Sequence, residues 1–129
     1  MAEQGPGKIP HLPTPATIDA YGNGGFRFAD MSHRGSLLCL PDGIWGWPVT
    51  RFSEIDEAAL AKVFAQAEAI DIFLIGCGAE AAVLPQALRA RFRSLTISAD
   101  PMPTGAAVRT YNILFAERRR VGAALIAVD

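Results

Sequence analysis

One nine-residue run, Ile70 to Gly78, constrains the fold of this chain more than any other stretch. The run is rich in Ile, Leu and Phe and stops at two glycines, Gly76 and Gly78. A short apolar run that ends on residues tolerant of positive φ is typical of a strand buried on both faces. We therefore expect a central strand here, covered by the amphipathic segments on either side of it, within an α/β domain.

Length and charge exclude several classes of protein. The chain has 129 residues, of which half are hydrophobic, and its net charge is −1. A chain of this length buries roughly two-thirds of its unfolded surface, enough for a real core. Its cationic run, Arg118 to Arg120, follows Glu117, whereas nucleic-acid binders usually carry a strong basic excess. The longest apolar runs are far shorter than the ~20 residues that a membrane span needs. We expect neither nucleic-acid binding nor a membrane span.

The two cysteines, Cys39 and Cys77, are far apart and have no histidine at ligand spacing. This pattern argues against a disulfide framework and against zinc, so no metal and no cofactor is expected. Free thiols indicate a reducing compartment, and the N-terminus lacks the basic and apolar regions of a secretory signal. We expect a cytoplasmic protein.

Prolines and glycines divide the chain into an arm and one domain. Residues 1–17 contain four prolines and predict an extended or mobile Pro-rich arm, and residues 18–129 form a single domain. A turn over 21–25 and short antiparallel strands in the N-terminal half predict a small antiparallel β part. The expected strands are 26–28, 35–40, 44–49, 94–98 and 121–128, the expected helices are 53–67, 85–91 and 105–118, and 30–34 is expected to be a polar loop.

Gly76 to Ala81 match the dinucleotide motif G-x-G-x-x-A, and Asp100 follows about twenty residues later, as the motif requires. Pro85, however, would interrupt the helix that must follow such a turn. Two interpretations stay open. Gly76, Cys77, Gly78 and Asp100 are weak candidates for cofactor binding, or the glycines only form a tight strand exit, which we favour. Cys77 is either an activated thiol or an ordinary semi-buried residue, and we favour the second.

Two apolar surfaces are candidates for binding a partner. Trp45 and Trp47 share one strand face, and aromatic side chains often anchor interfaces. In the last helix, Ile113 lies outside the core stripe, and Arg109 and Asn112 lie between the two faces. The alternatives are that the tryptophans pack under the helix starting at Ser53, and that the two polar residues bond to a neighbouring loop. The sequence offers no set of nucleophile, base and orienting group, so no catalytic residue is assigned.

Several segments together resemble a known family. They are Thr104 to Leu114, Glu117-Arg118 and Gly122 to Ile126, with Tyr21 to Phe26, Leu40-Pro41, Trp47 and Leu74 to Gly78. In combination they are similar to the mitochondrial complex I assembly factor 3 family and its uncharacterised prokaryotic relatives. The resemblance covers nearly everything after Ile18.

The resemblance implies a compact three-layer α/β domain with a central mixed β-sheet flanked by helices, and it implies no established catalytic residues. Eukaryotic members assist assembly of the respiratory NADH:quinone oxidoreductase. This chain has Cys77 where the family commonly has Thr, which weakens a catalytic thiol further. We expect a non-enzymatic binding or assembly protein that has a protein partner and that associates peripherally with a membrane through it; a homo-oligomer is compatible with this. The alternative is a small-molecule or nucleotide-binding domain that uses the Gly76-Cys77-Gly78 turn.

Overall fold

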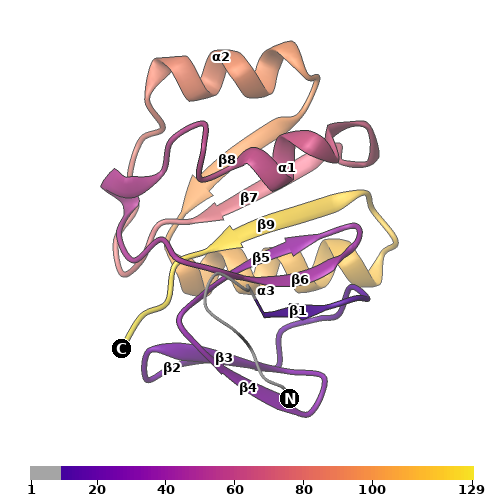
Figure 1. The fold of residues 1–129 in the computed structure, drawn as a ribbon, viewed down its shortest axis with the longest axis vertical. Coiled ribbons are helices and arrows are strands. Elements are labelled where there is room, and N and C mark those ends of the chain that lie inside the picture. Colours follow the sequence, from indigo (N-terminus) through magenta and orange to yellow (C-terminus); the bar gives the residue numbers. More distant parts are fainter. Residues whose placement is uncertain (1–9) are drawn as a thin grey trace.

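A computed structural model describes residues 10–129 and confirms the expected α/β class. It has a six-stranded mixed sheet, a three-stranded antiparallel sheet and three α-helices (Figure 1). The strands are β1 (His11–Leu12), β2 (Ala20–Gly22), β3 (Gly25–Phe28), β4 (Met31–Arg34), β5 (Ser36–Leu40), β6 (Gly43–Trp47), β7 (Ile72–Gly76), β8 (Ser98–Met102) and β9 (Val121–Leu125). The helices are α1 (Ala61–Ala65), α2 (Gln86–Ser94) and α3 (Thr104–Ala116), and short 3-10 turns cover Phe52–Glu54 and Ala67–Ala69.

The strand order of the large sheet is β1-β6-β5-β9-β7-β8. Strand β7 runs parallel to both β8 and β9, while β5 is antiparallel to β6 and β9. The apolar run after Ile70 is therefore a buried strand, as expected, but β9 rather than β7 lies nearer the middle of the sheet. Strand β8 is at the edge, where a strand tolerates a residue without an amide hydrogen such as Pro101.

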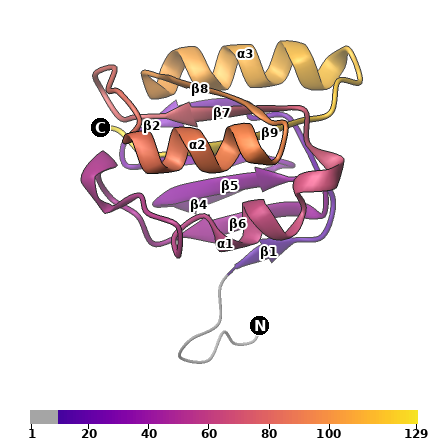
Figure 2. The ribbon, with the colours of Figure 1, turned by 90° about the horizontal axis from the view of Figure 1, so that it is seen from above.

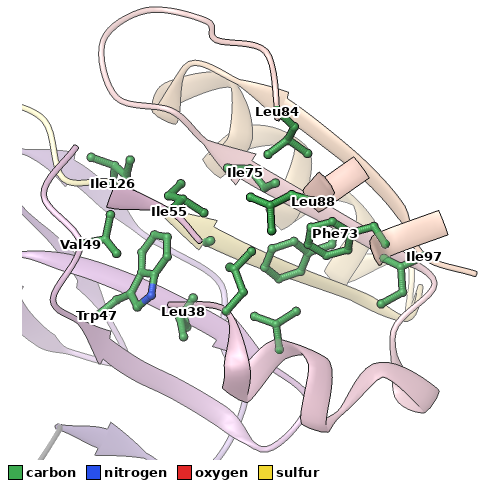
Figure 3. Packing of buried hydrophobic residues seen from close by; sticks show 14 of the residues in the cluster. Leu38, Trp47, Val49, Ile55, Phe73, Ile75, Leu84, Leu88, Ile97 and Ile126 are labelled. Carbon is green, nitrogen blue, oxygen red and sulfur yellow. The ribbon is translucent and has the colours of Figure 1, made fainter. Parts of the chain in front are cut away.

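Side chains alternate between two hydrophobic clusters, one on each face of the large sheet. Phe73 and Ile75 of β7 point into a cluster that α1 and α2 cover (Figure 3). Leu74, between them, belongs to a second cluster with α3 and the small sheet. Helices α2 and α3 consequently lie on opposite sides of the sheet (Figure 2). This arrangement gives the three layers that the family resemblance implies.

The small sheet, β2-β3-β4, is built from two tight hairpins. Asn23 and Gly24, at φ 53° and 79°, form the first two-residue turn, which suits a type I′ hairpin. Ala29 and Asp30, at φ 50° and 61°, form the second. Residues 31–34 were expected to be a loop, and this expectation is wrong because the second turn folds them back as β4.

The prediction of a helix over 53–67 is also wrong for most of that range, because α1 covers only Ala61–Ala65. Ile55 is extended, and the Asp56 carboxylate accepts a hydrogen bond from the Ala59 amide at 2.8 Å, so the chain turns before α1 begins. The apolar positions Ile55, Leu60 and Val63 are nevertheless all buried in the first cluster. The periodicity identified the core residues correctly, but local side-chain bonds set a different backbone path.

The strand expected over 94–98 starts and ends later, at Ser98 and Met102. Ser94 closes α2, and Thr96 has a φ of 60°, which no strand residue adopts. Pro101 lies within β8, and the position of this strand at the edge of the sheet permits a proline there. The last helix and the last strand were placed correctly to within a few residues.

Within the expected arm, the described residues begin at Pro10. His11 and Leu12 form β1, which pairs with Trp45 and Ile44 of β6. Strand β6 is therefore covered on this side over two residues, and it ends at Trp47, just before the exposed Pro48. Pro48 thus ends the strand without interrupting it.

Candidate functional site

The exit of β7 is a tight turn whose backbone donors are already used. The Cys77 amide donates to the Met102 carbonyl at 2.8 Å, and the Gly78 amide donates to the Thr104 hydroxyl at 3.0 Å. A dinucleotide site needs such amides free, and it needs a helix that starts directly after the turn. Here residues 79–85 intervene before α2 begins.

Asp100, the acidic residue of the motif, lies exposed on the edge strand β8 opposite Leu74. The geometry therefore favours the tight strand exit over a cofactor site. We expect calorimetric titration with NAD, NADP, ATP and FAD to show no binding tighter than ~100 μM, about 5.5 kcal/mol of affinity. A tighter complex with any of the four would reinstate the dinucleotide interpretation.

Thr104 holds this turn together. It is fully buried, and its hydroxyl donates to the Ile126 carbonyl at 2.7 Å while accepting from the Gly78 amide. The capping residue of α3 is Pro103, and Thr104 lies in the first turn of this helix. Its side chain instead joins the end of β7 to the segment after β9.

Gly78 has a φ of +103°, a region that side-chain-bearing residues rarely adopt. The nearest atom to an added β-carbon would be a methyl carbon of Ile126 at 4.0 Å, so backbone strain rather than space limits substitution. We expect Gly78→Val to lower the free energy of unfolding by about 1–3 kcal/mol, measured by urea denaturation. Ala79→Val, at the exposed neighbour, is the control and should change little. Equal stabilities of Gly78→Val and the wild type would contradict this account.

Neither thiol is activated by its surroundings. Burial raises the pKa of the Cys77 thiol, although hydrogen bonds involving the backbone of Ala82 and Met102 partly offset this effect. Burial also raises the pKa of Cys39 to about 12. Because the thiolate is the nucleophile, a raised pKa means a smaller reactive fraction at neutral pH.

We expect iodoacetamide to alkylate Cys77 more slowly at pH 8 than it alkylates a cysteine in an unfolded peptide. Cys39 should react only when the protein unfolds, because its side chain is fully buried. Mass spectrometry over a time course measures the alkylation rates of both cysteines. In the Cys77→Ser variant, only the alkylation of Cys39 is observed. A Cys77 thiol that titrates below ~7 would show an activated cysteine instead.

The two tryptophans have different environments. Trp47 is buried, 6% exposed, and its indole N–H donates to the Ala59 carbonyl at 2.8 Å. Trp45 is half-buried, stacks on the His11 ring with centroids 3.5 Å apart, and lies under the Lys62 ammonium at 4.0 Å. Its own N–H donates to the exposed carboxylate of Asp42. Of the pair, only Trp45 offers part of its surface to a partner.

The three candidate residues on helix α3 also differ in their environments. The Asn112 side chain makes two hydrogen bonds of 2.8 Å to the backbone of Ile18, accepting from its amide and donating to its carbonyl. This matches the alternative of bonding to a neighbouring segment. Arg109 is exposed, and so is Ile113, with 59% of its surface accessible.

The five candidates do not form one site. Trp45 and Trp47 pack on the face covered by α1 and α2, whereas Ile113 and Arg109 belong to the helix on the opposite face. Sequence reasoning did not identify His11 and Lys62 as neighbours of Trp45, because no spacing links residues so distant in the chain, and it did not identify the bond to Asp42 three residues earlier.

Among residues 10–129, no three His, Cys, Asp or Glu side chains come close enough to hold a metal ion. Within the same residues, no helix has the length and apolar character needed to cross a membrane.

The fold is that of an Mth938-like α/β domain. A Bordetella pertussis protein described as an Mth938-like domain superposes with a TM-score of 0.76 at 26% identity, covering 87% of this chain and 85% of that one. Residues 18–126 match the family described as "Protein of unknown function (DUF498/DUF598)", and the chain belongs to this family.

Similar proteins come from bacteria and from animals. A solved Rhodopseudomonas palustris structure is 54% identical, with a TM-score of 0.83 over 99% of this chain and 93% of that one. An uncharacterised Rhodobacter capsulatus protein is 42% identical over 126 residues, 98% of this chain and 93% of that protein. The NADH dehydrogenase [ubiquinone] 1 alpha subcomplex assembly factor 3 of Drosophila melanogaster is 32% identical over 114 residues. That match covers 84% of this chain but 57% of the fly protein.

Proposed function

We propose that this chain is a non-enzymatic binding protein that assists the assembly of the respiratory NADH:quinone oxidoreductase. The observation that carries the proposal is the 32% identity to the Drosophila assembly factor over 84% of this chain. The role requires a protein partner. We place the protein in the cytoplasm, reaching the membrane through that partner.

Trp45 is the best-supported anchor for the partner. Its bond to Asp42 and its stacking on His11 fix the indole ring, so little side-chain freedom remains to be lost on binding. A cavity of about 270 Å³ is lined by Leu38, Gly46, Trp47, Pro48, Ala58, Ala59, Ala61 and Lys62, and Lys62, which also lies over the Trp45 ring, connects it to Trp45. A fixed aromatic ring next to an apolar cavity suits an apolar side chain of a partner protein.

Deletion of the gene in its source organism tests the role. We expect less assembled NADH:quinone oxidoreductase on native gels and a matching loss of NADH oxidation in membranes. Wild-type protein should restore both, and Trp45→Ala should restore them poorly. Arg93→Ala, an exposed change on α2, is the control and should complement fully.

A normal amount of the assembled enzyme in the deletion strain would overturn the proposed function. Full complementation by Trp45→Ala would leave the function standing but remove Trp45 as the anchor. Circular dichroism and thermal melting of the purified variants must first show that both fold.

A further inference from the structure

A second concave site lies on the outward face of the small sheet. The cavity has a volume of about 400 Å³ and is lined by Ala20, Tyr21, Gly22, Asn23, Gly25, Phe26, Arg27, Ser32, His33 and Arg34. Its volume falls in the range of small-molecule sites. None of its lining residues is acidic, although the chain as a whole has a net charge of −1.

The strand register identifies which side chains face outward. Phe26 is buried in the core, so the side chain of the next residue, Arg27, points to the other face. Across the sheet, Arg27 pairs with Ser32, and Gly25 pairs with Arg34. Arg27 and Arg34 are therefore diagonal neighbours on the outward face, where such residues lie about 7–8 Å apart.

Small residues keep the space between the two arginines open. Gly22 and Gly25 face each other across β2 and β3, and Ala20 faces Arg27. A β-carbon at Gly25 would lie 3.1 Å from the Arg34 α-carbon and closer still to the His33 carbonyl oxygen, so the close approach of β4 requires glycine there. At Gly22, by contrast, an added β-carbon would meet no atom within 4 Å, so this glycine leaves open space beside the arginines.

Both guanidinium groups keep donors for a ligand. Arg27 uses one Nη1 donor on the Ser32 hydroxyl at 2.8 Å, which orients the group. Within residues 10–129, the side-chain ion pairs of arginine involve Arg51, Arg91 and Arg120 rather than Arg27 or Arg34. Each guanidinium carries five donors in a planar fork that matches phosphate and carboxylate oxygens.

We propose that this cavity binds a small dianion, held between Arg27 and Arg34 through its phosphate or carboxylate oxygens. The site is independent of the assembly role and of the Gly76 to Gly78 turn. Its chemistry fits a phosphate ester or a dicarboxylate, and pyrophosphate and succinate serve as probes for the two.

Titration of the full chain, followed by amide NMR shifts in 150 mM NaCl, tests the site, because this salt screens diffuse surface attraction. We expect at least one probe to shift the amides of Gly22, Asn23, Gly25 and Ser32 and to saturate. Arg27→Gln with Arg34→Gln should weaken binding at least 10-fold. The control is Arg89→Gln with Arg93→Gln, which removes the same charge from two exposed arginines one helical turn apart on α2.

Each outcome decides the matter. The proposal is supported if the cavity amides show saturable shifts that are lost in the Arg27→Gln, Arg34→Gln double variant and kept in the Arg89→Gln, Arg93→Gln double variant. The probe that binds then identifies the ligand class. The proposal would be overturned if both double variants weakened binding equally, or if neither probe shifted the cavity amides. Should the double variant not fold, Arg34→Gln alone is used, since its side chain makes no hydrogen bond to another described residue.

Discussion

Replacing Trp47 with alanine is expected to lower the free energy of unfolding by about 3–5 kcal/mol, as for other buried aromatic side chains. Trp47 packs beside Val49 and Leu38 in the cluster under α1 and α2 (Figure 3). The truncation removes these contacts and also leaves the Ala59 carbonyl without its indole donor. Urea denaturation followed by circular dichroism measures the loss.

Trp45→Ala is the matched control on the same strand face. Trp45 is only partly buried, so we expect a loss of no more than about 2 kcal/mol. Acrylamide should quench Trp45 fluorescence in Trp47→Phe more strongly than it quenches Trp47 in Trp45→Phe. If acrylamide quenches neither tryptophan and Trp45→Ala costs about 3 kcal/mol or more, Trp45 belongs to the core and the partner surface is assigned wrongly.

Thr104→Val is the second substitution with a large expected effect, about 2–4 kcal/mol. Valine keeps the shape of the side chain but leaves the Ile126 carbonyl and the Gly78 amide without their partner. A buried polar group without a hydrogen bond costs about 1–3 kcal/mol. Thermal and urea unfolding both report the change.

Two further variants test whether the loss of stability comes from the missing Thr104 hydroxyl. Thr104→Ser keeps the hydroxyl and should retain most of the stability, whereas Thr110→Val, at a partly exposed position of the same helix, should change it by less than about 0.5 kcal/mol. A Thr104→Val protein as stable as Thr104→Ser would show that the two hydrogen bonds contribute little.

The sequence predicted the α/β class, the buried strand ending at Gly76 and the last helix, because each depends on a local apolar pattern. It did not predict where the chain turns between Ser53 and Ala61. There, side chains such as Asp56 bond to nearby amides, and this competition leaves no periodic signal. It also placed the strand β8 too early, at 94–98 rather than at Ser98–Met102, because an edge strand tolerates a proline that would exclude a central one.

The candidate sites were less predictable than the fold. Arg27 and Arg34 are seven positions apart, and they become neighbours only because Ala29 and Asp30 adopt positive φ in a two-residue turn. Alanine is an unusual residue in such a turn, so the hairpin and the cavity that it creates had no sequence signal. His11 likewise becomes a neighbour of Trp45 only because β1 pairs with β6.

The position of β9 has a consequence for how the protein folds during synthesis. β9 follows every other strand in the chain, yet it lies between β5 and β7 in the sheet. Until it leaves the ribosome, the strands β1, β6 and β5 and the pair β7 and β8 have no strand to join them. The polypeptide therefore cannot complete its main sheet as it emerges, and until β9 is made both halves expose unpaired strand edges, which favour aggregation.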